Sequence, residues 1–420
     1  MESYAQVLQY AIPFFMVLIA IEWILGARMG VVTNRIMDTV SSLSSGMTNT
    51  IKEVLGLSIV IISYGWMVEH MALMHMESSW LLYLLTFIGL DFAGYWSHRF
   101  NHQINLFWNR HIIHHSSEEF NLACALRQSI SEFFGIYFFL LIPLALLGVP
   151  EKVIAIVAPL HLFAQFWYHT RLIDKMGFLE HIIVTPSHHR VHHAINSIYI
   201  DKNYAQIFIV WDKWFGTFQE ELEEEKPVYG VKKAVRTWNP ILINFQHVWL
   251  LIKDAWRAPR WIDKLRIWFM PTGWRPEGFM EKYPVQVDTA ATQVKYDVPA
   301  SRFMKGWSVV QLLFTLVLMI HMLRNVGDLS FIELLAYGGF IMLTIFTYTS
   351  LMDGFRLSWM LAVSLLLVGG VIFYWQGGWF QIPSASSIGA YVVLMVLLLS
   401  VIVAYSLRKE ISTYTLSQPI

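Results

Sequence analysis

Nine of the sixteen histidines fall into short patterns that could bind metal ions. His98 and His102 are four residues apart, and HxxHH motifs follow at residues 111–115 and 189–193, with His169 between them. On a helix, offsets of three and four residues put side chains on one face. Each motif can therefore direct its imidazoles to a common point.

The number of histidines argues for two metal ions. Chance would give roughly 0.02 copies of HxxHH in a chain of this length, so two copies indicate function. Imidazole suits zinc, copper, iron and nickel, so the ligand type does not choose the metal. A structural zinc closes with four ligands, which leaves too many histidines for one such site. Soluble di-iron proteins use Glu and Glu-x-x-His patterns, and this chain does not offer them.

Membrane helices are the elements that must position these histidines. Of the 420 residues, 56% are hydrophobic and 14% are charged, against roughly 25% charged in soluble domains. The net charge of zero gives no sign of a nucleic-acid partner. Eighteen Trp and eighteen Tyr fit a protein with two membrane interfaces. The composition predicts a multi-pass membrane protein.

About nine apolar runs are candidates for membrane spans. They are Tyr4–Leu25, Val54–Met71, Trp80–Trp96, Phe133–Val149, Val153–Trp167, Trp307–Met322, Phe331–Ser350, Trp359–Trp375 and Ile388–Tyr405. The fourth and fifth could instead form a re-entrant pair. Lys and Arg in the loops predict an outer N-terminus, with a cytosolic C-terminus and a cytosolic segment at residues 171–305. All nine histidines then lie at the cytosolic face.

The predicted fold is all-α: a transmembrane helical bundle with a cytosolic helical cap that carries the two-metal site. Trp-rich stretches at Val248–Trp256 and Trp261–Met270 are typical of helices lying in the interface. The predicted regions are N-terminal transmembrane helices at 1–80, a catalytic region at 81–278, a linker at 279–306 and a four-helix transmembrane region at 307–420.

The motifs also carry a family resemblance. The segments HRFNH, HIIHH and HHRVHH resemble the fatty acid hydroxylase and sterol desaturase superfamily of membrane-bound, non-haem di-iron enzymes. RHIIHHSSEEFNLACALRQS and TPSHHRVHHAINSIYIDKNYAQIFIVWDKWFGTF are similar to its alkylglycerol monooxygenase branch. The resemblance is strong over residues 91–278 and weak in the first 80 and last 120 residues.

The resemblance implies two iron ions per chain and a ligand set. The implied ligands are His98, His102, His111, His114, His115, His189, His192 and His193. We add His169 from its placement, although the family often has a second histidine where this chain has Gln165. His188 could replace His189, because His188 and His192 are also four residues apart.

The resemblance also implies a reaction. The chain would use O₂ to hydroxylate the carbon next to the ether oxygen of an alkylglycerol, which gives a fatty aldehyde and a glycerol derivative. Its partners would be a membrane lipid, O₂ and an external electron donor, because no dinucleotide-binding or haem motif is present. Tetrahydrobiopterin is the donor of the animal enzymes. Those enzymes carry Glu where this chain has Gln103, so a redox protein could replace the pterin.

Further polar residues are candidates for supporting the ligands or holding the lipid head group. Asp91 and Tyr95 share a helix face with His98 and His102, and Asp91 could accept from a ligand imidazole or join two helices. The others follow the two HxxHH motifs: Asn121, Arg127, Gln128, Asp201, Asn203 and Asp212.

Two other functions stay open at this stage. A sterol or fatty-acyl hydroxylase or desaturase could use the same di-iron centre. A zinc-bearing scaffold or metal transporter is the alternative from another class, although the histidines gather at one face and do not thread the bilayer. The cytosolic active face is compatible with either a bacterial inner membrane or the endoplasmic reticulum membrane.

Overall fold

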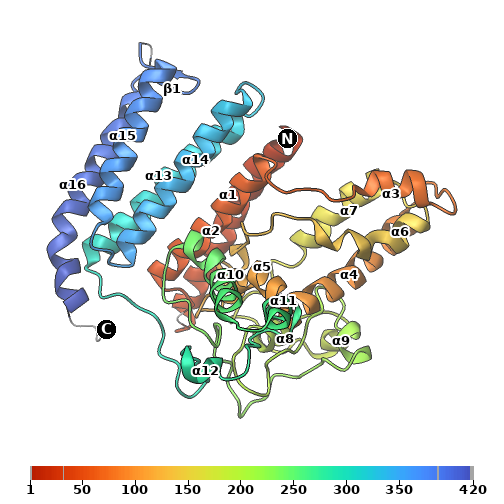
Figure 1. The fold of residues 1–420 in the computed structure, drawn as a ribbon. Coiled ribbons are helices and arrows are strands. Elements are labelled where there is room, and N and C mark those ends of the chain that lie inside the picture. Colours follow the sequence, from red (N-terminus) through yellow and green to blue (C-terminus); the bar gives the residue numbers. More distant parts are fainter. Residues whose placement is uncertain (1, 32, 386, 417–420) are drawn as a thin grey trace.

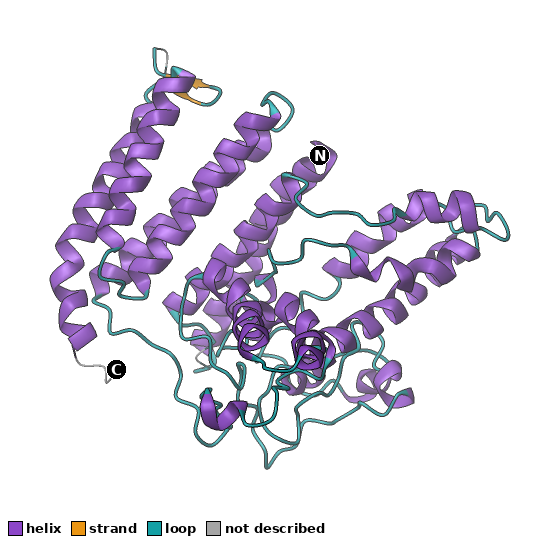
Figure 2. Ribbon diagram, viewed as in Figure 1, coloured by secondary structure: helices purple, strands orange, loops and turns teal. Residues whose placement is uncertain are grey.

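A computed structural model describes residues 2–31, 33–385 and 387–416, and these are mostly helical, with long loops and very little strand (Figure 2). The longer helices are α1 (Glu2–Arg28), α2 (Ile36–Val54), α4 (Trp80–Gln103), α5 (Asn105–His115), α7 (Glu151–Phe163), α10 (Pro240–Arg257), α11 (Trp261–Phe269), α13 (Arg302–Arg324), α14 (Phe331–Met352), α15 (Ser358–Gln376) and α16 (Gly389–Leu416). The shorter ones are α3 (Tyr64–Met71), α6 (Ile142–Leu146), α8 (Pro186–His192), α9 (Val210–Trp214), α12 (Phe279–Lys282), η1 (Cys124–Leu126), η2 (Ile136–Leu141) and η3 (Gly177–His181). Strands β1 (Gly378–Trp379) and β2 (Ile382–Pro383) form one small hairpin.

Five of the described helices are long and apolar enough to cross a membrane, namely α1, α13, α14, α15 and α16. They agree with the first and the last four predicted spans. The expected count of nine is not confirmed: of the middle four runs, one lies in the long helix α4, which is not among the five, and the other three form shorter or divided helices. Figure 1 shows α13–α16 on one side of the molecule, α1 in the middle, and α3, α4, α6 and α7 on the other side.

Chain breaks explain why the middle runs differ from the prediction. α3 has only 8 residues, a rise of about 12 Å, and it follows a turn at Gly56, which has a positive φ of 62°. The run at 133–149 is divided between η2 and α6, with Pro143 at the start of α6. α7 has 13 residues, about 20 Å. α4 is long enough to span, but it carries Asp91 at its middle and His98 and Arg99 in its C-terminal half. α6 and α7 are thus shorter than full spans.

α2 is a helix that the sequence analysis did not anticipate. Its sequence, IMDTVSSLSSGMTNTIKEV, is rich in Ser and Thr, yet most of its residues are buried. Ser41 donates to the carbonyl of Trp238, and Ser44 bonds the hydroxyl of Tyr348. α2 therefore joins the central polar segment to the C-terminal bundle.

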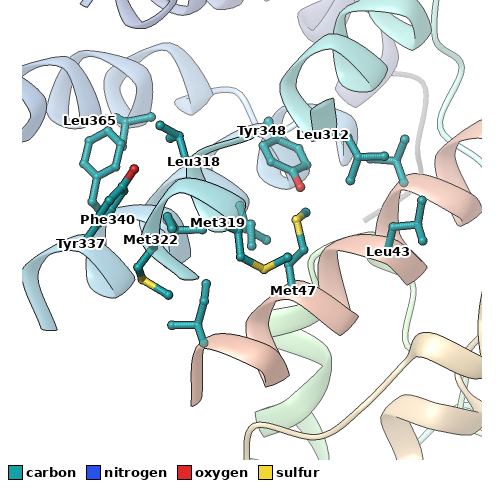
Figure 3. Close-up of a cluster of buried hydrophobic side chains, with 14 of the residues drawn as sticks. Leu43, Met47, Leu312, Leu318, Met319, Met322, Tyr337, Phe340, Tyr348 and Leu365 are labelled. Atoms are coloured by element: carbon teal, nitrogen blue, oxygen red, sulfur yellow. The ribbon is translucent and has the colours of Figure 1, made fainter. Parts of the chain in front are cut away.

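The main hydrophobic core lies between α2 and the C-terminal helices (Figure 3). Leu43 and Met47 of α2 meet Leu312 and Met319 of α13, and Tyr348 of α14 packs among them. Burying such side chains contributes about 1.5–3 kcal/mol each. The N-terminal and C-terminal helices therefore share one core and hold a fixed frame beside the histidines.

Candidate metal centre

Four segments bring the nine predicted histidines together below the membrane helices. The last turns of α4 carry His98 and His102, and α5 carries His111, His114 and His115. The segment after α7 supplies His169, and α8 with its C-cap supplies His189, His192 and His193. α4 and α5 are joined by a single non-helical residue, Ile104, so the two motifs face each other directly.

The nine histidines form two groups that could each hold a metal ion. The first group is His98, His102, His111, His115 and His192, and the second is His114, His169, His189 and His193. Within each group the candidate ligand atoms all lie within 4.8 Å of one another. The groups adjoin, because the rings of His115 and His193 stack with centroids 4.3 Å apart.

Distances between ligand nitrogens match the edges of a coordination polyhedron. The Nε2 atoms of His98 and His111 are 2.9 Å apart, and those of His102 and His115 are 3.2 Å apart. In the second group, Nε2 of His189 lies 2.9 Å from that of His169 and 3.0 Å from that of His193. Nitrogens bound at about 2.0–2.1 Å from one ion are separated by roughly 3.0–3.4 Å.

Backbone carbonyls fix the other ring nitrogen of several histidines. Nδ1 of His98 is 2.7 Å from the carbonyl of Tyr204, and Nδ1 of His192 is 2.9 Å from that of Lys202. In the second group, Nδ1 of His169 is 3.1 Å from the Gln165 carbonyl. A histidine that donates from Nδ1 presents the lone pair of Nε2, which is the form that binds a metal.

The burial of the imidazoles, and one imidazole nitrogen without a hydrogen-bond partner, also support metal binding by these groups. Nε2 of His192 is buried and has no hydrogen-bond partner among the described residues, an arrangement that costs free energy unless a ligand fills it. Burial lowers the pKa of His192 and His193 well below the ordinary value, and lowers the pKa of His114 to about 4. These imidazoles are therefore neutral near pH 7, as metal ligands must be.

The loop at 201–205 supports the first group and is itself held by Asp212. The Asp212 carboxylate accepts from the backbone N–H groups of Tyr204 and Ala205, both at 2.8 Å, and from the Thr217 hydroxyl at 2.6 Å. Asp201 and Asn203 have positive φ angles of 59° and 55°, which aspartate and asparagine tolerate better than most residues. Asn203 also donates to the carbonyl of His188.

Arg127 supports the second group through its backbone. Its carbonyl lies 3.3 Å from Nδ1 of His114. Its buried guanidinium donates to Asp38 at 2.9 Å, Ser42 at 2.9 Å and Ser116 at 2.7 Å. The ion pair between Arg127 and Asp38 thus fixes the segment after the first HxxHH motif against α2.

Two other candidates from this stretch hold the backbone. Asn121 donates to the carbonyl of Thr33 and accepts from the N–H of Cys124. Gln128 donates through its backbone to Ser45 and through its side chain to the Ala125 carbonyl. Both residues therefore fix the 121–128 segment.

Asp91 does not contact the clustered histidines directly. Its carboxylate accepts from His161, from the backbone of Ile207 and Phe208, and from Trp211, at 2.8–3.0 Å. It bonds none of the nine histidines. The prediction that Asp91 accepts from a ligand imidazole is therefore wrong, because the carboxylate is fully used in joining α4 to the 207–211 segment.

Three further candidates lie beside the groups. Tyr95 shares a hydrogen bond with Thr217 and accepts from Arg99. Gln103 is exposed and accepts from Arg99. His188 belongs to neither group: its Nδ1 accepts from the N–H of Thr185 in the capping box at the start of α8. The structure thus places His189, and not His188, among the clustered imidazoles.

A cavity of about 870 Å³ opens beside both groups. His98, His111, His114, His169 and His189 line it. One part is apolar, with walls from α1, α7 and α13 that include Ile12, Phe15, Phe163, Leu312 and Leu316. Another part is polar, with Asn49, Lys52, Glu53, Asn101, Arg110 and Glu132. The cavity is therefore lined by apolar side chains, by polar side chains and by the histidines.

Sequence reasoning missed several residues of this site. Lys202 and Tyr204 act through backbone carbonyls, which leave no side-chain signal. Lys52 and Glu53 lie on α2, far from the motifs in the sequence. Only Arg110 had a usable signal, because it directly precedes His111 in the first HxxHH motif.

Comparisons with known proteins identify relatives that share this region. The family model described as Fatty acid hydroxylase matches residues 83–217, which include all nine histidines. An alkylglycerol monooxygenase of Homo sapiens is 36% identical, over 84% of this chain and 79% of its own length. One of Xenopus tropicalis is 34% identical, over 82% and 77%. An ornithine lipid hydroxylase of Rhizobium tropici is 28% identical over 37% of this chain and 48% of its own. No solved structure matches.

Proposed function

This chain belongs to the alkylglycerol monooxygenase family, and we propose that it is an iron-dependent membrane monooxygenase that cleaves the ether bond of alkylglycerols. The carrying observation is that one cavity has an apolar region, a polar region and clustered histidines. A single-chain ether lipid has matching parts: an alkyl tail, an ether junction and a polar head.

The proposed metal ligands are the nine clustered histidines. His98, His102, His111, His115 and His192 would hold one iron, and His114, His169, His189 and His193 would hold the other. Iron bound there would supply the activation of O₂ that oxidation of an unactivated C–H bond requires. The proposed catalytic region is 81–278, with membrane helices before it and a linker and four-helix region after it.

The chain's own residues would orient the lipid. Ile12, Phe15 and Leu316 would enclose the alkyl tail, and their apolar surfaces would exclude water from the reacting carbon. The polar region would hold the head group. With both ends held, the carbon next to the ether oxygen lies beside the histidine groups, which is the positioning that a selective hydroxylation needs.

One oxygen atom of O₂ enters the C–H bond next to the ether oxygen, and the other leaves as water after taking up two electrons and two protons. The resulting hemiacetal loses its C–O bond, which releases a fatty aldehyde and a free glycerol hydroxyl. The two electrons come from an external donor, which we propose to be a reduced pterin such as tetrahydrobiopterin or a redox protein. We further propose that the histidine groups face the cytosol.

The test is a product assay on iron-loaded protein in detergent. The protein would receive 1-O-hexadecylglycerol, O₂ and either reduced pterin or a reduced ferredoxin, and fatty aldehyde would be measured by mass spectrometry. We expect aldehyde that disappears in His192→Ala. If protein with two irons gives no aldehyde with either donor, the ether-cleaving proposal fails. Sterols and fatty-acyl lipids then become the substrates to test.

A further inference from the structure

The outer face of α10 and α11 exposes large apolar side chains. Trp256 at the end of α10 is 85% exposed, and Trp261 at the start of α11 is 79% exposed. Trp261, Leu265 and Phe269 are four residues apart, so they share one face of α11, opposite the buried Ile267. An exposed apolar face of this kind lies against a membrane or a partner molecule.

The two helices lie across the membrane helices, at the level where α14 ends. Figure 1 shows α10 and α11 nearly end-on, whereas α13–α16 run along the plane of the view. Asn239, the N-cap of α10, donates to the Ser350 hydroxyl at 3.2 Å and to the Phe346 carbonyl, both in the last two turns of α14. Because α14 is a candidate membrane span, this places α10 and α11 at the height of a lipid head-group layer, where Trp side chains are common.

Every charged side chain of α10 and α11 that reaches the surface is cationic. Their only two carboxylates, those of Asp254 and Asp263, are buried, and each pairs with an arginine. Lys253, Arg257 and Arg266, in contrast, form no ion pair with a carboxylate among the residues that the structure describes. Each such cation near a membrane surface favours anionic lipids by roughly fivefold.

A group of cations around Asp254 adds to this positive charge. Both oxygens of the Asp254 carboxylate accept from Arg275, at 2.5 and 2.8 Å. Lys233 and Lys253 lie near the same pair, and burial together with the charges of Lys253 and Arg275 lowers the pKa of Lys233. Three cations thus share one carboxylate. A phosphate oxygen of a lipid head group would balance the excess charge.

The inner faces of the same two helices hold α5, which carries three of the clustered histidines. His247 of α10 donates to the Asn105 carbonyl at 2.8 Å, and the Asn105 side chain donates to the carbonyl of Ile267 in α11 at 2.9 Å. Asn109 donates to the carbonyl of Asn244 in α10 at 3.0 Å. A membrane that binds the outer face of α10 and α11 therefore also fixes the position of α5.

We propose that the outer face of α10 and α11 is a docking surface for anionic phospholipids of the bilayer. The Trp, Leu and Phe side chains enter the head-group layer, and Lys253, Arg257 and Arg266 bind lipid phosphates. These lipids support the helices that hold α5 and are distinct from the lipid in the cavity, so the proposal does not depend on the reaction. An acidic soluble protein could also bind a basic, aromatic face, but the position at the end of α14 favours the membrane.

The test uses the iron-loaded protein in nanodiscs of neutral phosphatidylcholine. Leu265→Cys would carry a bimane label on the exposed face of α11, since the single native cysteine, Cys124, is buried. Its quenching would be compared between equal, small fractions of phosphatidylglycerol and phosphatidylcholine with the same spin label near the head group. We expect phosphatidylglycerol to quench about fivefold or more strongly. A label at Glu224→Cys, in the exposed acidic segment 220–225, is the control and should be quenched by neither lipid.

A charge variant separates electrostatic binding from apolar contact alone. Combining Lys253→Gln, Arg257→Gln and Arg266→Gln keeps the apolar side chains and should reduce the preference for phosphatidylglycerol to less than about twofold, because these cations supply it. Lys226→Gln changes an exposed lysine outside α10 and α11 and should retain the full preference. An unchanged preference in the triple variant would overturn the proposal.

Ionic strength provides the same test without a change of charge. Raising it from about 0.1 M to about 1 M shortens the screening length from about 10 Å to about 3 Å, so the preference for phosphatidylglycerol should fall by at least about half. Equal quenching by the two lipids at low salt would overturn the anionic preference. A label that neither lipid quenches would place this face outside the membrane, overturn the proposal and make an acidic soluble protein the partner to test.

Discussion

His98 and Tyr204 are linked by a hydrogen bond of 2.7 Å from the imidazole Nδ1–H to the backbone carbonyl. The same loop supplies the carbonyl of Lys202 to His192. Two clustered histidines on different helices thus depend on one loop. The Asp212 carboxylate holds this loop by accepting two of its backbone N–H groups.

Asp212 should therefore control metal affinity without touching the metal. We predict that Asp212→Asn lowers iron affinity about 10- to 100-fold, the usual effect of losing the partners that orient a ligand. Iron per chain would be measured after dialysis against a graded chelator. Asp254→Asn is the matched control, because Asp254 is equally buried and pairs with Arg275 outside the centre. Equal iron loss in the two variants would contradict the prediction.

His188 and His192 should behave differently although both were candidate ligands. His192→Ala removes a member of the first group and should abolish at least one iron per chain. His188→Gln removes the histidine of the α8 capping box and should retain both irons, while the thermal midpoint falls by a few degrees. Metal analysis and thermal unfolding would be run on the same samples. If His188→Gln loses iron and His192→Ala does not, the assignment of His192 as the metal ligand is wrong.

Eight of the nine histidines could be predicted from the sequence because helical offsets of three and four residues are local, and His169 was added from its placement between the motifs. What spacing cannot give is the partition into groups. His192 joins histidines of α4 and α5, whereas His189 joins His169, and this depends on how α8 packs. The roles of the Lys202 and Tyr204 carbonyls could not be predicted either, because every residue has a backbone carbonyl.

The fold was predictable where apolar length alone decides, as for α1 and α13–α16. It was not predictable where tertiary contacts outweigh composition. α2 is helical because Ser41, Ser44 and Asp38 find partners in distant segments, although serine and threonine are only moderate helix formers. Hydropathy alone also does not register the turn at Gly56 in the run at 54–71, or the division of the run at 133–149 between η2 and α6.

The buried Arg127–Asp38 ion pair predicts that the single variants and the double variant will lose stability non-additively. Its side chains are only 2% and 1% exposed. Removing one partner leaves a buried charge and should cost about 3–5 kcal/mol. We expect Asp38→Asn or Arg127→Met to lower the free energy of unfolding by this amount, and the double variant to lose less than the sum. A double-mutant cycle, with the free energy of unfolding measured by denaturant titration, would give the coupling energy between the two side chains. Losses that simply add would contradict the prediction.

Lower pH should destabilise the metal-free protein through its buried neutral histidines. Burial lowers the pKa of His247 to about 4, and its Nε2 donates to the carbonyl of Asn105 at 2.8 Å. The unfolded chain takes up a proton near pH 6.5 and the folded chain does so near pH 4, so stability falls as pH decreases between these values. Each such histidine contributes about 1.4 kcal/mol per pH unit. Unfolding would be followed by denaturant titration from pH 7.5 to 5, and His247→Gln should have a shallower slope. A flat profile would contradict this.

The apolar wall of the cavity predicts control over chain length. Ala11 lines the cavity from α1, beside Leu8 and Ile12, and faces the same space as Leu312 and Leu316 of α13. A bulky side chain there removes room for the tail, so Ala11→Phe should reduce kcat/KM for hexadecyl substrates at least tenfold and spare octyl substrates. Ala11→Ser tests for a general effect on the helix, since it keeps the volume small. Rates would be compared across chain lengths in one detergent. An equal loss of kcat/KM for octyl and hexadecyl substrates would show that Ala11 supports the fold and does not limit the length of the alkyl tail.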